Sequence, residues 1–134
     1  MKKNLIIVTL MLASVLQAVS CGKSDNPPPS GTSPEGKWAG NQNNGIGGPV
    51  FYFELNLNAN AVIEVRANST TTPDIANGTW SLVGDSVRST YTFAGTGATY
   101  SLAGKYSATS NVMNGTIGLE TSTTGAGVFS VTKQ

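Results

Sequence analysis

The sequence predicts an all-β domain, folded as an eight-stranded antiparallel up-and-down barrel. From residue 36 onward, short runs rich in β-branched and aromatic residues alternate with clusters of glycine, asparagine and serine, as strands alternate with turns. No stretch after Cys21 repeats its apolar residues at helical spacing. The two tryptophans, four tyrosines and four phenylalanines all fall inside predicted strands, so the large side chains belong to one β-sheet core.

The first three strands are predicted over residues 36–40, 50–57 and 61–67. Residues 50–57 alternate most clearly, because every second side chain is large and apolar: Phe51, Phe53, Leu55 and Leu57. This period of two indicates a half-buried strand. The turn residues 58–60 follow, and Glu64 and Arg66 then share the face opposite to Ile63 and Val65. These two strands therefore each present one apolar face to a core.

The remaining five strands are predicted over residues 79–83, 87–93, 99–106, 112–119 and 127–132. The dipeptides Asn77-Gly78 and Gly84-Asp85 flank the first of them, and both are of the kind that forms tight hairpins. Glycine-, serine- and threonine-rich segments separate the others. Sequential hairpins favour a meander, and eight strands can close into a barrel that leaves no exposed edge.

The outward positions of these strands argue against a barrel that spans a membrane. They carry polar and charged residues: Glu54, Asn56, Glu64, Arg66, Arg88 and Lys105. In a membrane barrel these positions would face lipid, where charged side chains are destabilising. We therefore expect the barrel to stand in water.

A glycine followed two residues later by a large side chain recurs along the chain, first as Gly36-Lys37-Trp38. We expect these glycines at the corners where strands begin, because glycine tolerates a turn or bulge. Gly36-Lys37-Trp38 on the first strand of a meander resembles the Gly-x-Trp signature of lipocalin-like barrels, and less closely the first strand of avidin-type barrels. The resemblance implies that Trp38 closes one end of the barrel. The alternative is that Trp38 is a core residue of another all-β domain.

The start of the chain resembles a bacterial lipoprotein signal peptide of the Bacteroidetes type. Two lysines precede an apolar run, which ends at Ser20-Cys21, and a proline-rich segment follows. The resemblance implies a signal peptide over residues 1–20, acylation of Cys21 with chains such as palmitate, a tether over residues 21–35 and the barrel over residues 36–134. It places the protein in the cell envelope, anchored by lipid to the outer membrane on its periplasmic or surface face. An ordinary secretory leader is the alternative.

Charge and residue content bear on partners and catalysis. Of eight basic residues two lie in the leader, and the seven acidic residues then leave a net charge of −1, so we expect no nucleic-acid partner. The chain has no histidine, the commonest general base and metal ligand. Glu54 and Glu64 could pair like a glycosidase dyad, but we expect both to be solvated on the outer face. We therefore predict no enzyme activity, cofactor or metal.

Two classes of function remain. The first is an envelope interaction or inhibition module that meets another protein or a glycan. The alternative is a barrel that binds or sequesters a small apolar ligand among five inward aromatic side chains: Phe51, Phe53, Trp80, Tyr91 and Phe93. Because many large side chains share a small interior that packs densely, we expect a small cavity, with binding at the open end near residues 41–49.

Overall fold

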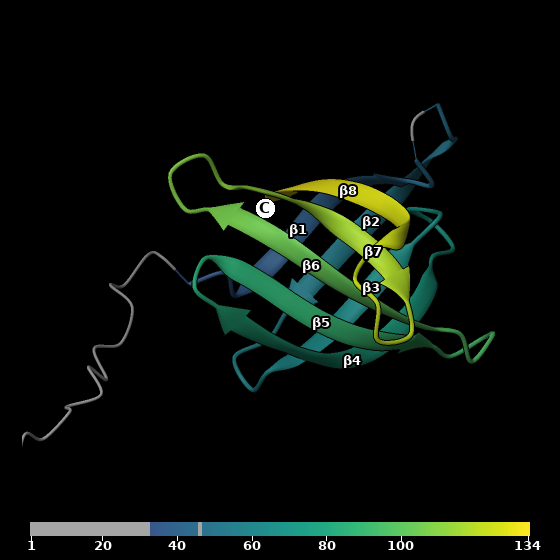
Figure 1. Cartoon of the computed structure of the whole chain (residues 1–134), viewed down its shortest axis with the longest axis horizontal. Helices are drawn as coiled ribbons and strands as arrows, with labels where there is room; N and C mark the ends of the chain where they lie inside the picture. The colour runs from purple at the N-terminus through teal and green to yellow at the C-terminus, as the bar shows by residue number, and fades with distance from the viewer. Residues whose placement is uncertain (1–32, 46) are drawn as a thin grey trace, which may run out of the picture.

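The computed structural model describes residues 33–45 and 47–134, and these form a closed antiparallel β-barrel (Figure 1). Its eight strands are β1 (Gly36–Asn43), β2 (Val50–Leu57), β3 (Val62–Ala67), β4 (Asp74–Val83), β5 (Ser86–Phe93), β6 (Thr99–Ser107), β7 (Val112–Leu119) and β8 (Gly125–Lys133). Each strand pairs with the next, and β1 also pairs with β8, which closes the sheet. The predicted eight-stranded up-and-down barrel is confirmed, and it is consistent with a lipocalin-like fold.

The predicted leader, the predicted lipidation site Cys21 and most of the predicted tether lie outside the described residues. No helix among the residues that the structure describes is long and apolar enough to cross a membrane.

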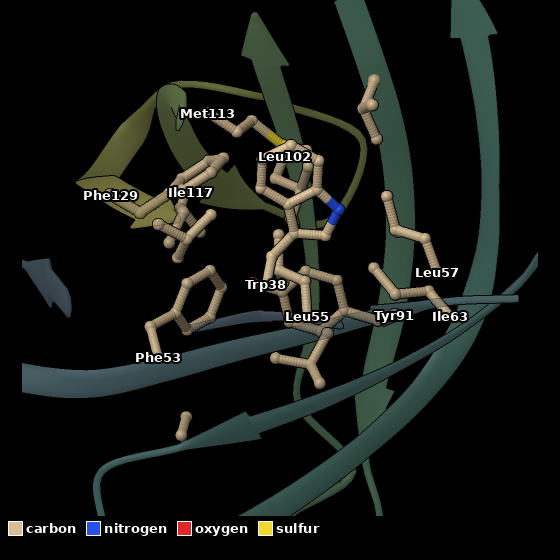
Figure 2. Packing of buried hydrophobic residues seen from close by; sticks show 14 of the residues in the cluster. Trp38, Phe53, Leu55, Leu57, Ile63, Tyr91, Leu102, Met113, Ile117 and Phe129 are labelled. Atoms are coloured by element: carbon tan, nitrogen blue, oxygen red, sulfur yellow. The ribbon is translucent and has the colours of Figure 1, made fainter. Parts of the chain in front are cut away.

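The alternation of side chains predicted for β2 and β3 is confirmed. Phe53, Leu55 and Leu57 are at most 1% exposed, as are the inward residues of β3. Trp38, Leu55 and Leu102 belong to the cluster of buried hydrophobic side chains drawn in Figure 2. Outward residues such as Arg66 remain partly exposed. The apolar face of each strand therefore supplies the core, as a period of two requires.

Strand β4 departs from the sequence-based prediction. It begins at Asp74, so Asn77-Gly78 lies within the strand and is not a hairpin turn. A Cβ atom on Gly78 would come within 1.9 Å of the carbonyl oxygen of Thr90 on β5. Glycine is needed here because the two backbones approach too closely for any side chain. The prediction of a hairpin turn at Asn77-Gly78, made from the turn preference of this dipeptide, is therefore wrong.

The recurring glycines also differ from the expected corners. Gly36 starts β1 with a φ of +116°, a conformation that favours glycine. Gly78 and the other three repeats, at Gly104, Gly115 and Gly127, lie inside strands. Strand β1 is also longer than predicted, since it runs to Asn43. The repeat therefore marks close packing within the wall of the barrel more often than strand corners.

The two ends of the barrel are built differently. One end, on the left in Figure 1, holds the start of β1, the end of β8 and the connections that follow β2, β4 and β6. The opposite end carries the connections that follow β1, β3, β5 and β7. We call the first the closed end and the second the mouth.

Candidate functional site

Trp38 plugs the closed end. Its side chain is 1% exposed, and its indole Nε1 donates a hydrogen bond of 2.7 Å to the carbonyl oxygen of Pro34. Tyr106 meets the indole edge-on at 6.4 Å between ring centroids, and the Lys133 ammonium lies 5.6 Å from the ring centroid. Lys133 also donates to the carbonyl oxygen of Ser33 at 3.0 Å. Ser33 and Pro34, just before β1, are thereby held across this end.

The mouth holds a cavity of about 640 Å³. Its wall combines aromatic and aliphatic side chains with three amides: Phe51, Tyr91, Phe93, Tyr100, Ile117, Leu119, Ala126, Gln42, Asn44 and Asn68, together with Gly125. The volume falls within the ~300–1,000 Å³ of small-molecule sites. Gln42 and Asn44 place the cavity beside the segment 41–49, where binding is predicted, and its volume exceeds that of the small cavity expected.

A second cavity of about 450 Å³ opens beside the first, along the connections that follow β3 and β5. On one side its wall is formed by Pro73, Asp74 and Ile75, and on the other by Ala94, Gly95, Thr96 and Ala98. Asn68, Phe93 and Tyr100 line both cavities. The mouth is therefore a site with two lobes, and these three residues form the border between them.

Three aromatic rings are packed together at this border. Phe93 and Tyr100 meet edge-to-face, with centroids 5.8 Å apart and planes at 85°. Tyr91 meets Phe93 at 5.9 Å and 80° and stacks on Tyr100 at 6.2 Å and 21°. Burial raises the pKa of the Tyr91 hydroxyl well above its ordinary range, and Tyr100 adds to this effect. The rings are held in the edge-to-face and offset geometries that aromatic pairs prefer, which makes them a preformed surface for another ring.

The structure separates the five residues predicted to bind a ligand. Phe51, Tyr91 and Phe93 line the mouth. Phe53 lies deeper, 1% exposed and packed against Phe129 with ring centroids 5.5 Å apart. Trp80 lies toward the closed end, where its Nε1 donates a hydrogen bond of 2.9 Å to the carbonyl oxygen of Asn58. Cys21, the predicted lipidation site, is outside the described residues.

Sequence reasoning missed other residues of the mouth. Tyr100 has an inward position in the alternation of β6, and this pattern in the sequence could have identified it as a residue of the site. In the structure it stands opposite Tyr91 in the register of β5 and β6. Gln42, Asn44 and Asn68 give no such signal, because amide residues at strand ends are usually turn formers. Their contribution depends on the closure of the barrel.

A charged cluster lies on the outer face of β1, β2 and β3, away from the mouth. Glu54 accepts a hydrogen bond from the Tyr52 hydroxyl and pairs with the Lys37 ammonium at 3.0 Å. The Arg66 Nε lies 3.9 Å from Glu54 Oε1 and 2.7 Å from Glu64 Oε1. Glu54 is only 5% exposed. The expectation that it is solvated is therefore wrong, because its neighbours cover it.

The protonation of this cluster follows from its contacts. Burial by itself raises the pKa of Glu54, but the hydrogen bonds from Tyr52 and Lys37 outweigh it and leave the pKa below its ordinary value. The hydrogen bond to Glu54 raises the pKa of Tyr52 to about 12, and burial adds to the rise. An ionised carboxylate held in ion pairs is a poor general acid. Neither Glu54 nor Glu64 lines the two cavities at the mouth.

No protein-family model matches this chain, and no curated protein or solved structure matches it significantly. Within residues 33–45 and 47–134, no three potential metal-ligating side chains come together. The candidate site therefore rests on the geometry of the mouth.

Proposed function

We propose that the protein binds a small amphipathic molecule with an apolar ring in the mouth of its barrel. The observation that carries this proposal is the two-lobed cavity whose lobes meet at Phe93 and Tyr100, two rings that are already packed against each other. Sites of this kind combine an apolar wall with a few convergent polar groups. The amides of Gln42, Asn44 and Asn68 supply those groups here.

Binding without catalysis is the role that the chemistry of the mouth supports. The chain has no histidine, and the cluster of Glu54 and Tyr52 that has shifted pKa values lies on the outer face. We propose that the protein acts in the cell envelope, anchored by lipid through Cys21 to the outer membrane. The leader pattern supports this location. Ser33 and Pro34 lie at the closed end, so a tether that joins the domain there leaves the mouth accessible.

Envelope interaction or inhibition is the second candidate, in which the mouth receives part of another protein or a glycan. The exposed apolar residues at this end favour it, since Leu119 is 59% exposed and Ile75 is 39% exposed, and both line the mouth. Val50, 65% exposed, begins β2 nearby. Exposed apolar groups that gather at one place mark interaction sites.

A matched pair of tyrosines on β6 tests the first candidate. Tyr100 and Tyr106 are both half-buried, but Tyr100 lines the mouth and Tyr106 contacts Trp38 at the closed end. We expect naphthalenemethanol, measured by titration calorimetry on the full chain carrying Cys21→Ala, to bind saturably. Tyr100→Leu should weaken binding about three- to tenfold, the value of one aromatic contact. Tyr106→Leu should leave the affinity unchanged. Absence of saturable binding, or equal effects of the two variants, would contradict the proposal.

A further inference from the structure

Asp74 is an exposed charged residue at the rim of the mouth, with the parity of the inner face. It is the first residue of β4 and pairs with Ala67 of β3, which is 1% exposed on the inner face. Ala76, two residues further along β4, is fully buried. Because side chains alternate along a strand, Asp74 has the inward parity of these two alanines. Its carboxylate therefore stands at the inner rim of the mouth, and it lines the smaller lobe.

Among the described charged residues of the strands, one other, Lys133, has an inward position in the alternation of its strand, and it lies at the closed end of the barrel. Lys133 stands opposite Trp38 in the register of β1 and β8. Its ammonium is engaged with the indole ring and with the carbonyl oxygen of Ser33. The lysine thus belongs to the plug of the closed end. Asp74, by contrast, forms no ion pair with a described residue, and its carboxylate accepts a hydrogen bond from Asn68 across the connection between β3 and β4.

The contacts of Asp74 leave its charge uncompensated. Asn68 Nδ2 donates a hydrogen bond of 2.5 Å to Asp74 Oδ2. Among the described residues the ion pairs involve Glu54, Glu64 and Asp85, and none reaches Asp74. An aspartate carries a negative charge at neutral pH. Its second oxygen, Oδ1, accepts no hydrogen bond from a described residue.

Asn68 is held in place by its backbone. Its N–H donates to the carbonyl oxygen of Tyr52 at 2.9 Å, and its φ of 71° lies in the left-handed region. Asparagine tolerates this conformation better than most residues, and strained backbone persists where its surroundings fix it. Because Asn68 Nδ2 is used by Asp74, the amide oxygen Oδ1 is the part of Asn68 that can accept a further hydrogen bond. The border of the lobes therefore offers acceptors and a negative charge.

Positive charge is missing from the walls of both lobes. No lysine or arginine lines either cavity, and Asp74 is the one charged residue among the lining residues that the structure describes. The faces of Phe93 and Tyr100 at the border also attract cations, because an aromatic face carries negative charge density. A carboxylate or phosphate group would find no countercharge here. A cation would find a carboxylate, an amide oxygen and aromatic faces together.

We propose that the ligand of the mouth carries a protonated amine, which is bound by Asp74 and Asn68 in the smaller lobe. Its apolar ring lies in the larger lobe against Tyr91, Phe93 and Tyr100. This inference rests on the proposed small-molecule function and assigns its ligand class: aromatic or amphipathic amines. Fatty acids and other apolar anions are disfavoured.

Three probes that share one ring and differ in charge test the assignment: naphthylmethylamine, naphthalenemethanol and naphthoate. Titration calorimetry at neutral pH and low salt, on the Cys21→Ala chain, should give the tightest binding for the amine. Partly exposed charge pairs contribute little individually, so we expect a two- to fivefold preference for the amine over the alcohol. Naphthoate should bind more weakly than the alcohol. The preference for the amine should shrink as salt is added, because salt screens exposed charges.

Two carboxylate-to-amide variants distinguish the specific effect of Asp74 on amine binding from the effect of removing any negative charge at this end of the barrel. Asp74→Asn should abolish the preference, so that this variant binds the amine no more tightly than it binds the alcohol. Glu120→Gln removes the same charge from the connection between β7 and β8 at the same end of the barrel, outside both cavities. This control should retain the preference. Equal binding of all three probes, or an amine preference that survives Asp74→Asn, would overturn the inference while leaving the proposed function intact. If none of the probes binds, the proposed function itself is wrong.

Discussion

Replacing Trp38 with alanine should destabilise the barrel more than any single change to the mouth. The indole is 1% exposed and fills the closed end between Pro34 and Tyr106. Truncating a buried tryptophan to alanine typically costs ~3–5 kcal/mol, through lost burial and the cavity that remains. The carbonyl oxygen of Pro34 also loses its donor. Trp38→Ala should therefore lower the free energy of unfolding by about 3–5 kcal/mol.

This loss is measurable as a shift in melting temperature. For a domain of this size, 1 kcal/mol corresponds to about 4–8 °C, so Trp38→Ala should lower the midpoint of thermal unfolding by at least about 12 °C. Circular dichroism of the two proteins would measure the shift. Trp38→Phe keeps a ring in the plug but removes the indole N–H. It should cost about 1–3 kcal/mol, because the carbonyl oxygen of Pro34 is left without its buried donor.

Trp80 supplies the control for this prediction. It is the other tryptophan of the chain, but it is half-buried and lies against the loop at Asn58. Trp80→Ala should therefore cost clearly less than Trp38→Ala, because less surface returns to water. If Trp38→Ala shifts the melting temperature by less than Trp80→Ala, Trp38 does not act as a plug and the lipocalin-like interpretation of Gly36-Lys37-Trp38 is wrong.

Three further predictions concern the anchor, the outer cluster and the wall. Cys21→Ala should move the protein from the membrane fraction to the soluble fraction, and an unchanged distribution would refute lipidation. Glu54→Gln should bring the pKa of Tyr52 down from about 12 toward 10 in a spectrophotometric titration, because the hydrogen-bonded carboxylate is gone; an unchanged titration would show that Glu54 does not cause the shift. Gly78→Ala should destabilise the barrel by about 3 kcal/mol, whereas Gly95→Ala, with open space at its Cβ, should have little effect. Equal effects of the two glycine substitutions on urea denaturation would contradict the close approach of β4 and β5.

The coupling of Tyr52 and Glu54 also sets how stability depends on pH. Glu54 has a lowered pKa in the folded protein, so its contribution is present above its ordinary pKa of 4.5 and is lost as the pH falls through the folded value. Tyr52 has the opposite sign. Its pKa rises from 10.0 to about 12 on folding, so its contribution is full below pH 10 and is lost as the pH rises toward 12.

Most of the fold could be predicted from local patterns. The alternation of Phe51, Phe53 and Leu55 fixes which face of β2 is buried, because a shift by one residue would expose all of them. The error at Asn77-Gly78 shows the limit of this reasoning. The dipeptide has the composition of a hairpin turn, yet its glycine is required by Thr90 on the next strand. Only the pairing of β4 with β5 reveals that contact.

The candidate site was harder to predict. The alternation of residues along a strand shows which side chains point into the barrel, but it does not show how far each lies from the mouth. Phe51 and Phe53 share one face, but the first lines the mouth and the second packs against Phe129 in the core. Depth depends on the register between strands and on their tilt. Trp80 has the same parity as Asp74, yet the two stand toward opposite ends of β4. A pattern of inward aromatic residues can therefore predict a core, but it cannot separate the part that packs from the part that binds.

The two inward charged residues show how this barrel divides stability from binding. At the closed end, the ammonium of Lys133 is used by Trp38 and Ser33, so its charge supports the packing of the plug. At the mouth, the carboxylate of Asp74 accepts a hydrogen bond from the Asn68 amide and lines a cavity whose described lining residues include no lysine or arginine. Lys133 gains its partners within the chain. The carboxylate of Asp74 is exposed at the mouth, and we have proposed that the protonated amine of a ligand supplies its countercharge.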